Sequence, residues 1–197
     1  MLKLAGKTIA AMALAATLGA GCTLRLKPQS DVFYDAILEA QPGNEFVLYA
    51  QGRNLLDQGQ FAQARKAFAD FTRQYPRRAS GWAALGQCEL GLKEYGSAES
   101  AFMKALAVES SLTCEAGLIS ALVFQGKIAD AEVRIAEASG KYGENAVLMR
   151  LKGDLALFAE NYKEAVDFYR RSLKINPNQA DLKRRVEDLK RFSGPRP

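Results

Sequence analysis

The stretch ASGWAALGQCELGLKEYGSAESAFMKALAVESS, residues 79–111, contains a pattern that recurs along the whole chain. Its alanine at position 98 has counterparts at intervals of 34, 33 and 34 residues, and a bulky apolar residue follows each alanine by four positions. A glycine precedes the alanine by twelve positions in three units, whereas the third unit has Ile119 there. A period of about 34 residues is typical of helix–turn–helix arrays. The recurring residues are Ala64, Ala98, Ala131 and Ala165; Phe68, Phe102, Ile135 and Tyr169; and Gly52, Gly86 and Gly153.

Apolar spacing predicts two helices in each unit. In residues 79–111 the positions i, i+3, i+4 and i+7 place one set of residues on a single face of a first helix. A second helix is expected to begin near Ser97, after a turn at residues 91–94 in which Gly91 acts as the C-terminal stop. Small residues on the two helices face each other where the helices cross, and the bulky residue fills the space where they splay. The face of the first helix comprises Trp82, Leu85, Gly86 and Glu89.

These residues resemble the tetratricopeptide repeat (TPR) family, most closely in the second unit and least in the third. The resemblance implies an all-α fold, a right-handed superhelical TPR solenoid. We expect repeats at residues 45–78, 79–111, 112–145 and 146–179. Apolar stripes on either side predict an N-terminal cap helix at residues 31–44 and a C-terminal cap helix at residues 180–192, as solenoid ends require. A disordered tail is expected at residues 193–197.

The N-terminus has the three parts of an export signal, with Lys3 and Lys7 before an apolar run and small residues at its end. The small residues stand directly before Cys22, which resembles a bacterial lipobox. That resemblance implies a signal peptide at residues 1–21, lipidation of Cys22 and a lipidated linker at residues 22–30. Because Thr23 replaces the aspartate of the inner-membrane retention signal, it also implies an outer-membrane protein facing the periplasm. The alternative is an ordinary secretory signal with an incidental cysteine.

Composition excludes several classes of function. The chain has no histidine, which removes Ser-His-Asp and Cys-His nucleophiles and histidine-ligated zinc. The net charge of +5 comes from the two ends of the chain, and residues 28–180 carry a net charge of −2, which argues against nucleic-acid binding by the repeats. We therefore expect no catalytic residue, metal, cofactor, small-molecule substrate or nucleic-acid partner. Cys88 and Cys114 are expected to be buried free thiols rather than a disulfide.

The TPR resemblance also implies a concave groove that binds a protein or peptide, either a helix or an extended segment, and is lined by the first helix of each unit. Aromatic residues and arginine are the usual anchors of interfaces. The alternative is that the apolar residues of this face pack between neighbouring first helices. The candidate contact residues are Tyr49, Arg53, Asp57, Gln87, Ser120, Phe124, Arg150, Asp154 and Phe158.

In its lipobox and repeat layout the chain is similar to the TPR lipoproteins of tight-adherence (Tad/Flp) pilus assembly and to type IV pilus pilotins. This similarity implies a non-enzymatic interaction scaffold that assists assembly of an envelope machine of the pilus or secretin type. An adaptor that recruits or organises peptidoglycan enzymes is the alternative.

Overall fold

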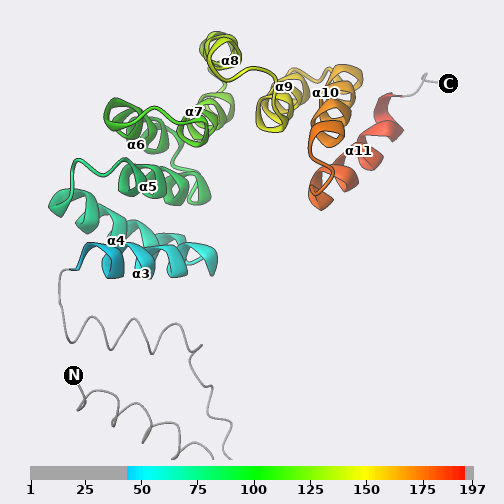
Figure 1. Cartoon of the computed structure of the whole chain (residues 1–197). Helices are drawn as coiled ribbons and strands as arrows, with labels where there is room; N and C mark the ends of the chain where they lie inside the picture. Colours follow the sequence, from blue (N-terminus) through cyan, green and yellow to red (C-terminus); the bar gives the residue numbers. More distant parts are fainter. Residues whose placement is uncertain (1–43, 194–197) are drawn as a thin grey trace, which may run out of the picture.

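The computed structural model describes residues 44–193, which form a solenoid of α-helices (Figure 1). Within this range there are nine helices and no strand. The helices form four antiparallel pairs followed by a single helix at the C-terminal end. They are α3 (Glu45–Asp57) and α4 (Phe61–Gln74), α5 (Ala79–Gly91) and α6 (Tyr95–Val108), α7 (Leu112–Phe124) and α8 (Ile128–Tyr142), α9 (Ala146–Phe158) and α10 (Tyr162–Ile175), and α11 (Ala180–Ser193).

Each pair packs against the next through the first helix of the following pair. Thus α5 packs on both α3 and α4, and α7 packs on both α5 and α6. Figure 1 shows α3 to α7 stacked in this way, with α9, α10 and α11 forming the other end of the array. The first helices therefore form one face of the solenoid and the second helices the other. We call these the groove face and the outer face.

The closest contacts within a pair join a glycine of the first helix to an aromatic ring of the second. A Cβ atom at Gly52 would lie 2.7 Å from the Phe68 ring, and one at Gly86 would lie 2.8 Å from the Phe102 ring. Gly117 of the following pair confines the Phe102 ring from its other side. Because protein interiors are closely packed, only residues without a side chain fit at these positions. The four recurring alanines, Ala64, Ala98, Ala131 and Ala165, are completely buried.

The third pair departs from this arrangement, as its sequence suggested. Ile119 replaces the glycine and Ile135 replaces the ring, and both are buried in one hydrophobic cluster. Two branched side chains thus occupy the volume that a glycine and an aromatic ring share elsewhere. Helix α8 packs less closely on α7 and on α9 than the other second helices pack on their neighbours, and it stands apart from the stack in Figure 1.

A residue with positive φ reverses the chain between the two helices of every pair. These residues are Gly59, Lys93, Gly126 and Glu160. Helix α5 ends at Gly91, as predicted, but Lys93 rather than Gly91 takes the left-handed conformation in the turn. Gly91 instead makes room for the ring of Phe61. The second helix of that unit begins at Tyr95, two residues before the predicted Ser97.

Several expectations concern residues beyond the described range. The signal peptide, Cys22 with its linker, and the N-terminal cap helix apart from Asn44 all lie outside it, as do residues 194–197 of the expected tail. Asn44 itself caps α3 by accepting a hydrogen bond from the Phe46 backbone amide. Ser193 ends α11, one residue past the predicted end of the C-terminal helix. Within residues 44–193, no helix is both long and apolar enough to cross a bilayer.

Replacement of Gly86 by alanine tests the fit between the helices of a pair. The added methyl group would collide with Phe102, which cannot retreat because Gly117 lies behind it. We expect Gly86→Ala to lower the free energy of unfolding by about 1–3 kcal/mol, as overpacked cores do. Gly140→Ala is the control, because a Cβ there meets no atom within 4 Å. Its helical propensity should raise stability by about 0.5–1 kcal/mol. Urea unfolding measures the free energy of unfolding of both variants. Equal changes in the two would contradict the close fit between Gly86 and Phe102.

Replacement of Lys93 by glycine tests the turn. A residue with a side chain pays about 1–2 kcal/mol to adopt the left-handed conformation of Lys93. Glycine avoids this steric cost, but it loses more conformational entropy on folding, which offsets part of the gain. We therefore expect Lys93→Gly to raise the thermal midpoint slightly. Lys66→Gly, in the exposed middle of α4, should lower stability by about 1 kcal/mol. If the thermal midpoint falls in both variants, the turn at Lys93 is not strained.

Candidate partner-binding groove

The groove face contains two hollows, one at each end of the array. The N-terminal hollow, of about 250 Å³, is lined by α3, α5 and the start of α7. The C-terminal hollow, of about 430 Å³, is lined by α7, α9 and α11. The structure therefore divides the predicted contact residues into two groups. Tyr49, Arg53 and Gln87 line the first hollow, and Ser120, Phe124, Arg150, Asp154 and Phe158 line the second.

Arg53 and Gln87, two of the predicted contact residues in the N-terminal hollow, are paired with each other. Arg53 donates hydrogen bonds to Gln87 Oε1 at 2.8 Å and to Asp57 Oδ1 at 3.0 Å. Asp57 lies beyond the hollow and serves as the partner of Arg53. The ring of Tyr49 packs against Phe68 and Phe71, with centroids 5.6 Å and 5.7 Å apart. A ligand here would have to displace interactions that the folded chain already makes.

The C-terminal hollow offers exposed aromatic surface beside a free positive charge. Phe124 from α7 is 57% exposed and Phe158 from α9 is 49% exposed. Arg150, on the same helix as Phe158, is exposed and has no hydrogen bond or ion pair with any residue in the described part of the chain. Phenylalanine is among the residue types that are most often buried in folded proteins. An apolar contact area and an unpaired guanidinium together favour a partner segment that carries a carboxylate next to apolar side chains.

Neighbouring helices hold the two phenylalanine rings in place. Phe124 stacks on Tyr95 of α6, with centroids 5.2 Å apart and ring planes 20° apart. The edge of Phe158 approaches Gly126 in the turn between α7 and α8. Rings that are already positioned lose little conformational freedom when a ligand binds, which favours affinity.

The Asp154 carboxylate has a structural role and is not free to contact a partner. Its Oδ1 accepts hydrogen bonds from the Tyr169 hydroxyl at 2.7 Å and from Arg185 at 2.8 Å. Burial and then the charge of Asp154 raise the pKa of Tyr169 far above its ordinary value, so the hydroxyl remains a donor. Asp154 thereby joins α9 to α10 and α11. The Ser120 hydroxyl is also occupied, since it donates to the Ala116 carbonyl at 2.9 Å.

Arg185 lines the C-terminal hollow and was absent from the predicted contacts. The sequence analysis treated its helix as a polar cap. A usable signal did exist, because α11 begins 34 residues after α9 and so continues the series of first helices. Extending the repeat by one more helix would have placed α11 on the groove face.

Comparison with known proteins assigns the family. The family model described as Tetratricopeptide repeat matches residues 49–111 and 117–180, which is more than half of the chain. The chain belongs to the TPR family. No curated protein matches the sequence.

Solved TPR structures share this fold. A thermophilic TPR protein of Thermus thermophilus superposes with a TM-score of 0.70 at 18% identity, over 80% of this chain and 87% of that one. PilF of Pseudomonas aeruginosa gives 0.58 at 24% identity, over 78% of each chain. YrrB, described as a TPR protein with an unusual peptide-binding site, gives 0.60 at 16% identity over 79% and 81% of the two chains. At these identities the similarity shows the fold.

Both cysteines of the described part of the chain belong to the core, and Cys114 also lines the N-terminal hollow. Cys88 and Cys114 are buried and unbonded, in agreement with the expectation of two free thiols. Burial, followed by the charge of the adjacent Glu89, raises the pKa of Cys88 to about 11, so its thiol is unreactive at neutral pH. No group of three or more potential metal ligands occurs among residues 44–193.

Removal of the Asp154 carboxylate tests its structural role. Asp154→Ala leaves the Tyr169 hydroxyl and Arg185 without their shared acceptor, and a buried donor without a partner costs about 1–3 kcal/mol. We expect a loss of that size in urea unfolding. Asp57→Ala is the control, because that side chain is 65% exposed and forms a surface pair worth less than about 1 kcal/mol. Equal losses would contradict the assignment.

Proposed function

We propose that this TPR protein is an outer-membrane lipoprotein that scaffolds assembly of an envelope machine of the pilus or secretin type. Lipid on Cys22 holds the chain at the membrane, and the groove face binds a helix or extended segment of an assembling subunit. The protein acts by binding and performs no chemical step.

The C-terminal hollow carries the binding half of this proposal. It combines two exposed aromatic rings with the unpaired Arg150, whereas Arg53 and Gln87 of the N-terminal hollow already hydrogen-bond to each other. Arginine and aromatic residues in one concave site are the usual centres of binding energy in interfaces. We therefore place the main contact with the partner at α7, α9 and α11.

Two observations support the choice of machine. The small residues before Cys22 resemble a lipobox, and the chain shares the fold of PilF of Pseudomonas aeruginosa. Acyl chains on Cys22 would supply the membrane affinity, at about 0.8 kcal/mol for each buried methylene group. A scaffold fixed in this way would present its groove to subunits that arrive in the periplasm.

Charge reversal at Arg150 tests the groove. Envelope proteins would be crosslinked in cells that produce the full-length chain, and the captured partner identified by mass spectrometry. We expect Arg150→Glu to reduce capture of a pilus or secretin subunit by about tenfold or more, equivalent to about 1.4 kcal/mol. The control is Lys152→Glu, on the same helix but outside the C-terminal hollow. Unchanged capture by Arg150→Glu would contradict the groove assignment. Groove-dependent capture of cell-wall enzymes would instead favour the adaptor that recruits peptidoglycan enzymes.

Replacement of Cys22 tests the membrane half separately. Cys22→Ser removes the thiol that would be acylated, so we expect the chain to move from the outer-membrane fraction to the soluble periplasmic fraction. Intact-mass measurement of the wild-type protein should show the added acyl groups. Wild-type protein without acyl groups, or unchanged fractionation of the variant, would contradict lipidation. Neither outcome would affect the test of the groove with Arg150→Glu.

A further inference from the structure

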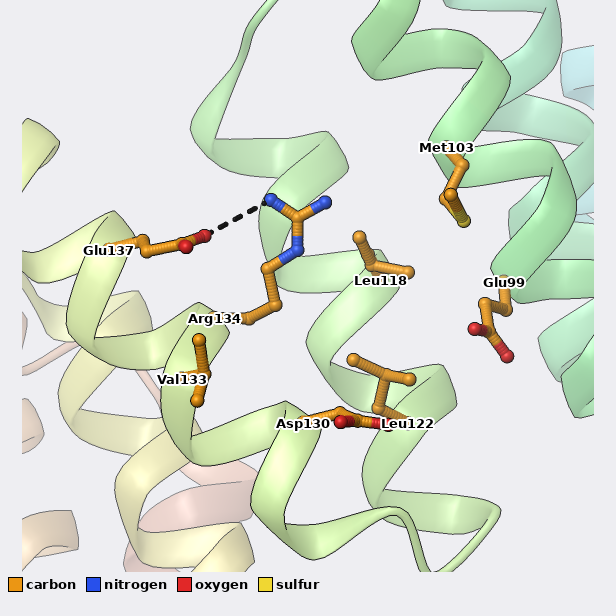
Figure 2. A pocket seen from close by; sticks show the side chains of 8 residues that line it. All are labelled: Glu99, Met103, Leu118, Leu122, Asp130, Val133, Arg134 and Glu137. Atoms are coloured by element: carbon orange, nitrogen blue, oxygen red, sulfur yellow. Dashed lines mark hydrogen bonds and ion pairs between the residues drawn. The ribbon is translucent and has the colours of Figure 1, made fainter.

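The outer face has a cleft of its own, about 350 Å³ in volume, between α6 and α8 (Figure 2). Met103 of α6 and Val133 of α8 form its two walls, and Leu118 and Leu122 of α7 lie between them. The two leucines are almost completely buried. The cleft therefore has an apolar floor that belongs to the core and walls that belong to two different repeats.

The walls expose larger apolar side chains than the equivalent positions of the other repeats carry. Met103 is 52% exposed and Val133 is 58% exposed. At the equivalent positions of the other described second helices the side chains are small, polar or charged, so at these two positions a pair of larger apolar residues occurs only between α6 and α8. The counterparts of Met103 are Ala69, Ala136 and Arg170, and those of Val133 are Lys66, Ser100 and Asp167. An exposed apolar pair costs solvation free energy unless something covers it.

Carboxylates dominate the rim of this cleft. Three of them, Glu99, Asp130 and Glu137, line it together with one guanidinium, that of Arg134. Arg134 is already engaged by Glu137 at 3.3 Å and by Glu115 at 3.8 Å. The rim residues thus carry a net charge of two negatives, which favours a cationic occupant.

One of the carboxylates is available to a partner. Glu99 binds Lys127 at 2.7 Å and Gln125 at 2.8 Å, and the hydrogen bonds from these two side chains lower its pKa. Asp130 has no hydrogen bond or ion pair with any other residue of the described part. It lies in the first turn of α8, on the same helix as Val133. A basic group bound at Asp130 would therefore lie beside the apolar walls.

We propose that the cleft between α6 and α8 binds a short basic amphipathic segment of a partner protein. An apolar side chain of that segment lies between Met103 and Val133 over the two leucines, and a lysine or arginine pairs with Asp130. This site lies on the face opposite the groove and does not depend on the groove's function. With both faces occupied, the repeats would hold two protein segments at once.

Site-specific photo-crosslinking identifies the occupant. A photoreactive phenylalanine analogue would replace Val133 in the full-length chain, and crosslinked peptides from native cells would be sequenced. The matched control places the same analogue at Lys66, the equivalent exposed position of α4. We expect a crosslink specific to position 133, to a segment that contains apolar residues and at least one lysine or arginine. Crosslinking no stronger than at position 66, to an acidic segment, or to a second copy of this chain would overturn the proposal.

A binding measurement then tests the charge. The crosslinked segment, as a synthetic peptide, would be titrated against the full-length wild type and the Asp130→Lys and Asp130→Asn variants. We expect about tenfold weaker binding to Asp130→Lys, a smaller loss for Asp130→Asn, and weakening by salt. The control is Glu132→Lys, an exposed carboxylate of the same helix that faces a different hollow. Binding to a correctly folded Asp130→Lys variant that stays within about twofold of the wild type would overturn the proposal.

Discussion

The fit of an aromatic ring against a glycine between the two helices of a repeat is the constraint on which this structure depends. Phe68, Phe102 and Tyr169 each occupy the space that a side chain at Gly52, Gly86 or Gly153 would need. The ring fills the space between helices that cross closely, and the following repeat packs against the same ring. Each repeat therefore fixes the position of the next, which is how a solenoid whose repeats contact only their neighbours keeps one shape.

The third repeat shows the effect of relaxing this constraint. With Ile119 and Ile135 in place of a glycine and a ring, the pair of α7 and α8 retains a buried core but packs less closely. The cleft beside α8 has walls made by Met103 and Val133, whose counterparts in the other repeats are small, polar or charged. A change in the core of one repeat thus coincides with a change in the surface that the repeat presents.

The groove face is similarly uneven. In its N-terminal hollow, Arg53 is engaged in hydrogen bonds and Tyr49 packs against the core. These interactions contribute to the stability of the first two repeats. Its C-terminal hollow is lined by the unpaired Arg150 together with the exposed rings of Phe124 and Phe158. Interactions that the folded chain leaves unmade are the ones available to a partner. The asymmetry concentrates the capacity for binding at one end of the array.

The sequence by itself determined the repeat, the pairing of helices and most of the residues that line the two hollows, because each of these depends on contacts between neighbours at a fixed spacing. It could not show which of those residues are free. Asp154 and Arg150 occupy similar positions on one helix, but only the tertiary structure brings Tyr169 and Arg185 to the first and leaves the second alone. The cleft on the outer face also required the structure, because its walls come from two repeats and its width depends on how α8 packs. Local periodicity specifies a helix and its faces, whereas charge pairing and the gaps between repeats are set by the three-dimensional packing of side chains distant in sequence.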